Sequence, residues 1–170
     1  MENFIDLVLR RRSIRRYSDK PIEKEKLDNI LTAALASPSA KHLNPWEFVV
    51  VTDNAALERL AGVKTYGSSM LAGAKAAIAV CVDDILTDTW QCDGSIAAHN
   101  MLLCAEDEGL GGCWVHVAGR EQSEQLVREE LGIPDRLRVL CIVSLGYKAE
   151  EKKMINKEKL QYEKVHYGKY

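Results

Sequence analysis

Apolar residues occur along this chain in two patterns. Four short runs are apolar at nearly every position, which predicts buried strands at Trp46–Val51, Ala76–Val82, Cys113–Val117 and Leu137–Leu145. Elsewhere apolar residues return every three or four positions, which predicts helices from Phe4 into the arginines that follow, from Pro21 to about Ser37, from Asn54 to Leu60, from Gly94 to about Asp107, and from Gln122 to Leu131. Short strands interleaved with helices predict an α+β fold with helices around a small mixed central sheet.

The stretch that follows Asp93 differs from the other predicted helices. Its apolar residues spread over more than one face, and such a helix is usually buried on several sides. Asp93 is a suitable N-cap for it, and Gly109–Gly112 would end it. These glycines follow a helix, precede a strand and lack GxGxxG spacing, so they are not a dinucleotide-binding turn. We expect this helix at the centre of the fold or in a subunit interface.

Residues 148–170 follow neither pattern, because charges are dense and apolar residues sparse. The segment nevertheless carries side chains that are poor choices for a disordered tail, at Tyr162, Val165, Tyr167 and Tyr170. We interpret it as a C-terminal arm that packs on a second subunit. With no linker or internal repeat, residues 1–170 are expected to form one domain.

Composition restricts the function classes to consider. The chain has 46% hydrophobic and 28% charged residues and a net charge of −2, so its basic cluster is local and nucleic-acid binding is disfavoured. Five cysteines lie in or beside apolar stretches without a CxxC pair, which is typical of buried, reduced thiols in a cytosolic protein. We see no signal peptide, no apolar run of ~20 residues and no metal-ligand spacing, and expect a cytoplasmic protein without membrane or metal.

Two segments near the N-terminus carry candidate chemistry. Residues 10–16 contain five arginines and Ser13, and arginine forks with a hydroxyl suit a phosphate. The alternative is a solvated basic helix end, which the helix dipole favours. Residues 37–46 form a proline-punctuated turn of small and amide residues, which suits a flat ring but alone also fits an ordinary helix-to-strand turn. Together the two segments suggest a bound phosphorylated cofactor.

Several motifs follow one another in the order of a known family, namely Arg11–Arg15, Pro38–Trp46, Asp93–Leu103, Gly109–Trp114, Leu145–Tyr147 and Glu163–Tyr167. Over nearly its whole length the chain thus resembles the nitroreductase family of FMN-dependent oxidoreductases. The resemblance implies a homodimer with FMN at the dimer interface. It also implies that hydride passes from NADH or NADPH onto flavin N5, and electrons then to a nitroaromatic, quinone or similar small-molecule acceptor, by a ping-pong mechanism.

The same resemblance assigns roles to individual residues. Arg11, Ser13 and the neighbouring Arg12 would hold the FMN phosphate. Arg15 would face the N1/O2 edge of the ring, where a fixed guanidinium stabilises the negative charge of reduced flavin. The other implied cofactor contacts are Pro38, Ser39, Ala40, His42 and Asn44, the backbone N–H groups around Val115, His116 and Val117, and Lys157.

Some of these positions keep alternatives open. His42 stands where the family usually has asparagine and could contact the substrate, and Asn44 stands where glutamine is usual. Lys157 either reaches the phosphate or is a solvated charge, and Lys159 is a weaker match. No side chain needs to be a general base, because flavin N5 carries the chemistry.

Two other functions remain open at this stage. The chain has little insertion between Ala61 and Ile85, where longer relatives build a lid, so it could be a flavin-binding redox or sensor protein that NAD(P)H reduces poorly. The segment Tyr66–Met70 also lacks an obvious equivalent of the amide or lysine that some relatives give to the ring. A phosphate- or nucleic-acid-binding module that uses the arginines alone is disfavoured by net charge.

Overall fold

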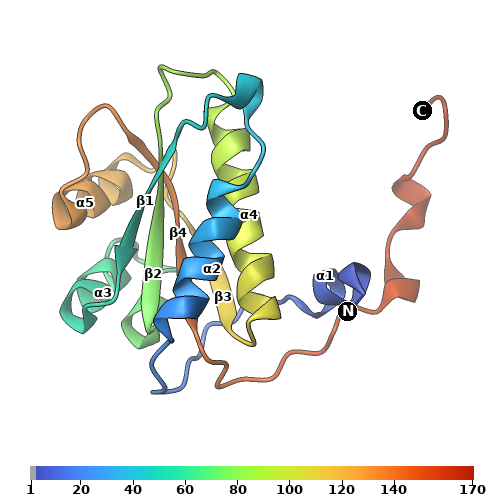
Figure 1. Ribbon diagram of the computed structural model, residues 1–170, viewed down its shortest axis with the longest axis horizontal. Helices are drawn as coiled ribbons and strands as arrows, with labels where there is room; N and C mark the ends of the chain where they lie inside the picture. Colours follow the sequence, from blue (N-terminus) through green and yellow to red (C-terminus); the bar gives the residue numbers. More distant parts are fainter. Residues whose placement is uncertain (1–2) are drawn as a thin grey trace.

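The computed structural model describes residues 3–170 and places helices on both faces of a four-stranded sheet (Figure 1). The strands are β1 (Trp46–Val51), β2 (Ala76–Val82), β3 (Gly111–His116) and β4 (Arg138–Gly146). The helices are α1 (Phe4–Arg10), α2 (Lys24–Leu35), α3 (Asn54–Ala61), α4 (Trp90–Asp107) and α5 (Glu121–Leu131), with short 3-10 turns η1 (Ala40–His42), η2 (Ser69–Gly73), η3 (Lys157–Lys159) and η4 (Tyr162–Lys164). The predicted α+β class is confirmed, and β1 and β2 span the residues predicted for them.

The strand order is β1-β2-β4-β3, and each neighbouring pair of these strands is antiparallel. The sequence predicts a mixed sheet, and the structure corrects this detail. β2 and β3 run in the same direction, but β4, the last strand in the chain, inserts between them and runs the opposite way. A parallel pairing occurs in the isolated bridge between Ser13 and Gly112, on β3 at the edge of the sheet.

Each face of the sheet buries its own hydrophobic core. α2 and α4 cover one face, where Ile30 and Met101 are fully buried. α3 and α5 cover the other face, where Leu57 and Val127 are fully buried. Successive residues of a strand point to opposite faces, so β2 contributes to both cores and all seven of its residues are buried. This two-sided burial explains the uninterrupted apolar run in β2.

α4 is buried on several sides, as predicted, but its start is corrected by the structure. It begins at Trp90 instead of Gly94, with Thr89 at the N-cap position. Asp93 therefore lies inside the first turn and does not cap the helix. Its buried carboxylate accepts the N–H of Ala40 instead, so the side chain serves the loop before β1.

α2 also begins later than predicted, at Lys24 instead of Pro21. The residue before it, Glu23, is extended, and its carboxylate accepts the hydroxyl of Tyr147 at 2.7 Å. The ammonium of Lys20 lies 3.8 Å from the centroid of the Tyr147 ring. These contacts tie the connection before α2 to the end of β4.

The connection between α1 and α2 carries the arginines and lies against the sheet. The N–H of Ile14 donates to the carbonyl of Gly112 at 3.0 Å. A Cβ at Gly111 would lie 2.7 Å from the Ile14 side chain, and a Cβ at Gly146 would lie 2.7 Å from the ring of Tyr17. The missing side chains at these glycines are what allow this close approach.

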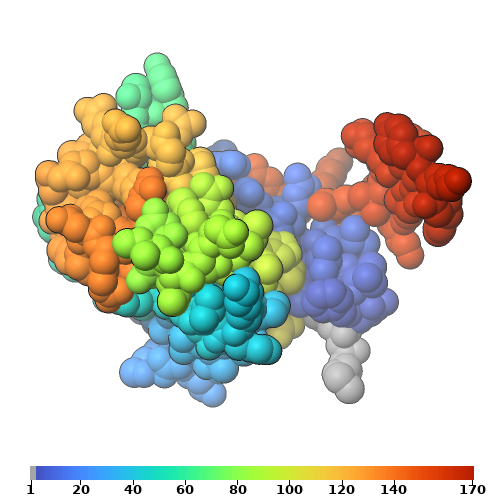
Figure 2. Space-filling model, turned by 90° about the horizontal axis from the view of Figure 1, so that it is seen from above, coloured from blue at the N-terminus to red at the C-terminus, as the bar shows by residue number. Residues whose placement is uncertain are grey.

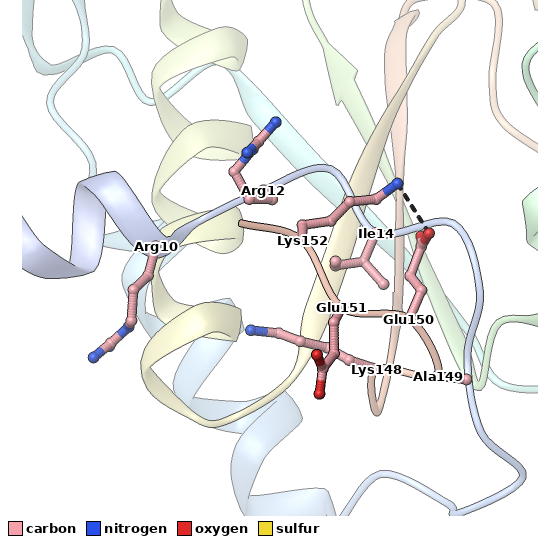
Figure 3. A pocket seen from close by; sticks show the side chains of 8 residues that line it. All are labelled: Arg10, Arg12, Ile14, Lys148, Ala149, Glu150, Glu151 and Lys152. Carbon is pink, nitrogen blue, oxygen red and sulfur yellow. Dashed lines mark ion pairs between the residues drawn. The ribbon is translucent and has the colours of Figure 1, made fainter. Parts of the chain in front are cut away.

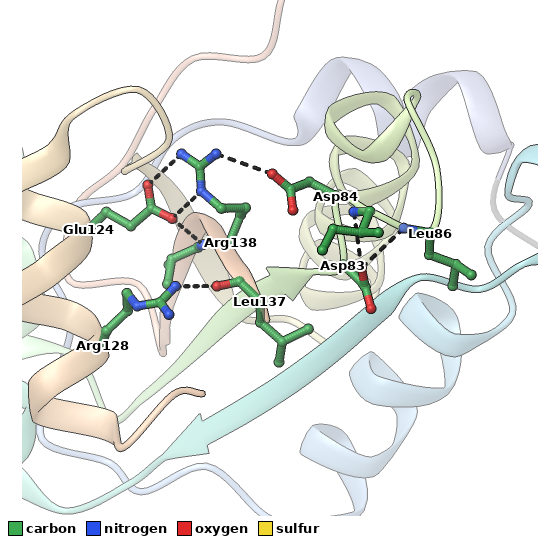
Figure 4. Close-up of polar contacts among 9 residues, drawn as sticks. Asp83, Asp84, Leu86, Glu124, Arg128, Leu137 and Arg138 are labelled. Carbon is green, nitrogen blue, oxygen red and sulfur yellow. Dashed lines mark hydrogen bonds and ion pairs between the residues drawn. The ribbon is translucent and has the colours of Figure 1, made fainter. Parts of the chain in front are cut away.

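A charged cluster joins α5, the start of β4 and the loop after β2 (Figure 4). Arg138 binds both carboxylate oxygens of Glu124, at 2.8 and 2.9 Å, and reaches Asp84 at 3.3 Å. Glu124 also accepts the N–H of Val139 at 3.0 Å. Burial alone would raise the pKa of Glu124, but Arg138 and the Val139 N–H outweigh it and lower that pKa.

After β4 the chain passes α1 and extends away from the sheet as the C-terminal arm, residues 148–170 (Figure 1). Figure 2 shows the end of the arm projecting from the body. Its large apolar side chains are exposed, namely Met154, Leu160, Tyr162, Val165, Tyr167 and Tyr170. Packing of the arm on a second subunit stays a prediction. Every helix within residues 3–170 is too short or too polar to cross a lipid bilayer.

Candidate functional site

Arg11, Ser13 and Arg15 belong to the segment that lies along the beginning of β3, where Ser13 pairs with Gly112. Burial raises the pKa of the Cys113 thiol there. The charge of Arg15, a hydrogen bond with Ser13 and the charge of Arg11 oppose that rise in the pKa of Cys113. Within residues 3–170, the guanidinium groups of Arg11 and Arg15 donate no hydrogen bond to a protein acceptor. Guanidinium groups that are not paired with a carboxylate can bind an anionic ligand.

A cleft of about 650 Å³ opens beside this segment (Figure 3), lined by Arg10, Arg12, Ile14 and residues 148–152. Arg10 and Arg12 point to different sides of it. Arg12 donates to the carbonyl of Lys153, and Arg10 Nε lies 3.7 Å from Glu106 Oε1. Arg10 is therefore half-buried rather than a plain surface residue. The Arg12 guanidinium holds the C-terminal segment, and its contact with a phosphate stays a prediction.

The C-terminal segment supports the arginines from the side away from β3. Glu150 accepts the backbone N–H of Arg15 at 2.6 Å. This N–H, followed by the Lys152 ammonium, lowers the pKa of Glu150. Lys148 binds both oxygens of the buried Glu106 at 2.7 Å. The arginine segment is thus held between β3 and the first residues of the arm.

Lys157 and Lys159 lie farther along the arm, at the two ends of η3. Both are exposed. The arm is attached shortly before them, because the N–H of Ile155 donates to the carbonyl of Leu9 at 2.9 Å. A phosphate contact stays a prediction for either lysine.

The open edge of β3 presents the backbone of His116. The N–H of Val117 donates inward to the carbonyl of Leu140 at 3.1 Å. Because backbone groups alternate along a strand, Val115 also faces β4, where it pairs with Ile142, and His116 faces outward. Of the three amides predicted to face a flavin, the geometry leaves that of His116 on the open edge.

Lys64 is a residue that the sequence reasoning missed. Its ammonium donates to the carbonyl of His116 at 3.0 Å, on the same open edge of β3. Burial lowers the pKa of Lys64, and the charge of Arg120 lowers it further. In the sequence Lys64 precedes the segment Tyr66–Met70, in which no ring contact was found. Nothing in the local pattern links it to a strand 52 residues away.

The loop that contains Pro38, Ser39, Ala40, His42 and Asn44 has an unusual backbone. Three non-glycine residues have positive φ, Lys41 at 53°, His42 at 55° and Asn44 at 47°. Such conformations cost on the order of 1 kcal/mol each and persist where surrounding contacts impose them. Two bonds close the loop, because the Ser39 hydroxyl donates to Asn44 Oδ1 at 2.9 Å and accepts the Asn44 N–H at 3.0 Å.

The loop and the arginines attach at opposite ends of α4. The loop contacts Asp93 in the first turn of this helix, whereas Ser13 pairs with Gly112 beyond its last turn. Figure 1 shows η1 near one end of α4 and α1 near the other. With 18 residues at about 1.5 Å each, α4 spans about 27 Å. In the middle of α4, burial and then the charge of Arg11 lower the pKa of His99.

A model described as the nitroreductase family matches residues 8–89 and 64–147. The chain belongs to the nitroreductase family. A relative from Archaeoglobus fulgidus, named as an NADH dehydrogenase/NAD(P)H nitroreductase, is 43% identical over 156 residues, 89% of each chain. The solved structure of an FMN-dependent nitroreductase from Clostridium difficile R20291 is 44% identical, with a TM-score of 0.95 over 98% of this chain and 99% of that one.

A further relative is named for flavin reduction by NADPH. The NADPH-flavin oxidoreductase of Vibrio harveyi is 33% identical over 165 residues, which are 86% of this chain and 66% of its own length. The resemblance noted from the motifs is confirmed, and this nitroreductase-family chain is an oxidoreductase of nitroreductase type.

Proposed function

We propose that the protein is an FMN-dependent NAD(P)H oxidoreductase that passes electrons to a nitroaromatic, quinone or similar acceptor by a ping-pong mechanism. The observation that carries the proposal is that the Arg11–Arg15 segment lies along the beginning of β3, where Ser13 pairs with Gly112 and the N–H of Ile14 donates to the Gly112 carbonyl at 3.0 Å. The relatives named above as FMN-dependent or flavin oxidoreductases support the cofactor and donor.

Within this proposal the residues of the chain bind and orient the cofactor. Arg11 and Ser13 hold the phosphate with charge-assisted hydrogen bonds. Arg15 lies nearer the ring, where its fixed positive charge stabilises the reduced state. The outward N–H of His116 fixes the ring by a backbone hydrogen bond. Bound FMN supplies a hydride acceptor at N5, so no side chain has to take the proton of a substrate.

We further propose that the site is shared between two copies of the chain. The loop at Ser39–Asn44 and the arginines attach at opposite ends of α4, so one site would take its arginines from one protomer and its loop from the partner. The exposed apolar side chains of the arm supply area for such an association. His42, exposed in this loop, would then contact the substrate, and Lys157 would add charge at the phosphate.

The test is the visible spectrum of the purified protein after incubation with FMN, followed by NADH or NADPH without oxygen. A flavin spectrum that bleaches, and recovers on adding a quinone or nitroaromatic, is the expected result. A protein that binds no FMN contradicts the proposal.

A second candidate is a flavin protein that NAD(P)H does not reduce efficiently. It is favoured by the connection between α3 and β2, residues 62–75, which holds only the short turn η2 and no larger lid. A bound flavin that bleaches with dithionite but not with NADH or NADPH supports this candidate over the first.

A further inference from the structure

Asp93 is a buried carboxylate that contacts the loop of the site and has been given no role in binding or catalysis. Its side chain lies in the first turn of α4, and the residue is 4% exposed. One oxygen accepts the N–H of Ala40 at 3.0 Å, and the other accepts the Thr89 hydroxyl at 3.1 Å. The Thr89 hydroxyl also contacts that of Thr87 at 2.7 Å. The Asp93 carboxylate is thus hydrogen-bonded to Thr89 at the start of α4 on one side and to the N–H of Ala40 in the loop on the other.

The amide that Asp93 holds stands at the head of the strained loop. Ala40 is followed by Lys41 and His42, both with positive φ, and Asn44 makes the third such residue. The remaining bonds within the loop, such as those between Ser39 and Asn44, move with it and cannot fix its place. Bonds from Asn100 to Ser37 and from Asp83 to Pro45 hold the two flanks of the loop. The Ala40–Asp93 bond links the loop itself to the buried part of α4.

We propose that Asp93 is a positioning residue, which pins the Ser39–Asn44 loop to α4 and thereby sets where His42 and Asn44 stand in the substrate pocket. The proposal rests on the proposed function in one respect, namely that this loop faces the flavin and the acceptor. Asp93 itself touches neither. Loss of the bond would let the loop relax from its left-handed conformation and would misplace its side chains.

Two substitutions separate geometry from charge. Asp93→Ala removes the acceptor for the Ala40 N–H. Asp93→Asn keeps an oxygen for Ala40, and its amide can donate to Thr89, whose hydroxyl turns to accept. The matched control is Glu124→Ala, which removes a carboxylate of similar burial, 6% exposed, from α5 on the other face of the sheet.

The first measurement is hydrogen exchange of the Ala40 amide by NMR, on the protein as purified. Asp93→Ala should raise the exchange rate at Ala40 about tenfold or more, while Asp93→Asn and Glu124→Ala stay within about threefold of the wild type. Unchanged exchange at Ala40 in Asp93→Ala would overturn the proposal. This measurement does not depend on flavin or turnover.

The second measurement is steady-state kinetics of the FMN-loaded enzyme with NADH and the quinone menadione. Asp93→Ala should raise the KM for menadione about tenfold with less change in kcat, and Asp93→Asn should restore it. An equal rise in KM for Glu124→Ala would mean general destabilisation and contradict the positioning role. If the wild type is not reduced by NAD(P)H, the proposed function fails, whereas the exchange result still decides whether Asp93 pins the loop.

Discussion

At the scale of the residue, the arginine cluster contains side chains with different surroundings. Arg11 and Arg15 flank the residues that pair with β3, and the charge of each lowers the pKa of the Cys113 thiol. Arg12 bonds the start of the arm, and Arg10 faces the buried Glu106. Arginines that are neighbours in the sequence thus have different surroundings in the folded protein. The consequence is that neighbouring substitutions should have different effects.

Arg11→Ala should weaken FMN binding about 10- to 100-fold, because it removes a charged hydrogen-bond donor from the phosphate site. Titration of the protein with FMN, followed by flavin fluorescence, measures this. Arg10→Ala is the matched control and should change the dissociation constant less than about threefold, since Arg10 faces Glu106. Equal losses in both variants would show that the phosphate site has been assigned to the wrong arginine.

At the scale of the element, glycines and ion pairs decide how segments lie against one another. Gly111 and Gly146 allow the arginine segment to approach β3 and β4. The Arg138–Glu124 pair holds α5 to the start of β4. Both devices combine residues far apart in the chain, and each can be tested by a single substitution.

Gly111→Ala should lower the free energy of unfolding by about 1–3 kcal/mol, because the added Cβ would lie 2.7 Å from Ile14. It should also weaken FMN binding, since displacement of Ile14 moves the arginines on either side of it. Urea unfolding and FMN titration measure the two effects. Gly73→Ala, where a Cβ has no neighbour within 4 Å, is the control and should leave FMN binding unchanged. An unaltered affinity in Gly111→Ala would contradict the link between this packing and the site.

Glu124→Gln should destabilise the protein at pH 7 and do so less as the pH falls. The pKa of Glu124 in the folded protein is below its ordinary value, despite burial, because of Arg138 and the Val139 N–H. The stabilisation from Glu124 is therefore present above pH about 4.3, the ordinary glutamate pKa, and is lost as the pH falls through the lower folded value. Urea unfolding of both proteins between pH 3 and 7 tests this.

The control for this pH series is Glu58→Gln, an exposed position on α3. It should change the free energy of unfolding by less than about 0.5 kcal/mol at every pH. A difference between Glu124→Gln and the wild type that stays constant from pH 7 to 3 would contradict the assignment of the effect to the ionised carboxylate.

At the scale of the whole molecule, the two candidate halves of the site belong to opposite ends of α4. A homodimer with a twofold-symmetric, isologous interface contains every shared site twice. Each dimer would therefore contain two sites, each built from both chains. The exposed apolar side chains of the arm lie outside both cores and are consistent with this arrangement. Mixing of two defective chains tests it directly.

At an FMN concentration just sufficient for the wild type, Arg11→Ala and Asn44→Val should each lose most FMN-dependent turnover. Equal mixtures refolded together should then recover about a quarter of wild-type sites. Valine does not tolerate the positive φ of 47° at Asn44, so that variant spoils the loop half. Half of the dimers in the mixture are hybrids, and each hybrid has one intact site. Turnover with NADH and menadione after co-refolding measures the recovery. No recovery would mean that both halves come from the same chain.

The sequence by itself determined most elements of this fold, because apolar spacing along a segment reflects the faces that it buries. It gave β1 and β2 to the residue and the central position of α4. The ordered motifs also determined the family, since Arg11–Arg15, Pro38–Trp46 and the later motifs carry local chemistry that survives without coordinates. Among the site residues, the roles of Arg11, Ser13 and the neighbouring Arg12 at the phosphate, and of Arg15 at the ring, stay predictions.

Only the tertiary structure decided contacts between segments that are distant in the chain. β2 and β3 run in the same direction, and β4 lies between them and runs the opposite way. Both of these pairings are therefore antiparallel. Asp is a residue type that commonly caps helix N-termini, yet the Asp93 carboxylate accepts the N–H of Ala40, 53 residues away. Lys64 and His116 meet across 52 residues without any local signal. Such pairings depend on where whole elements pack, and a local pattern along the chain cannot record that.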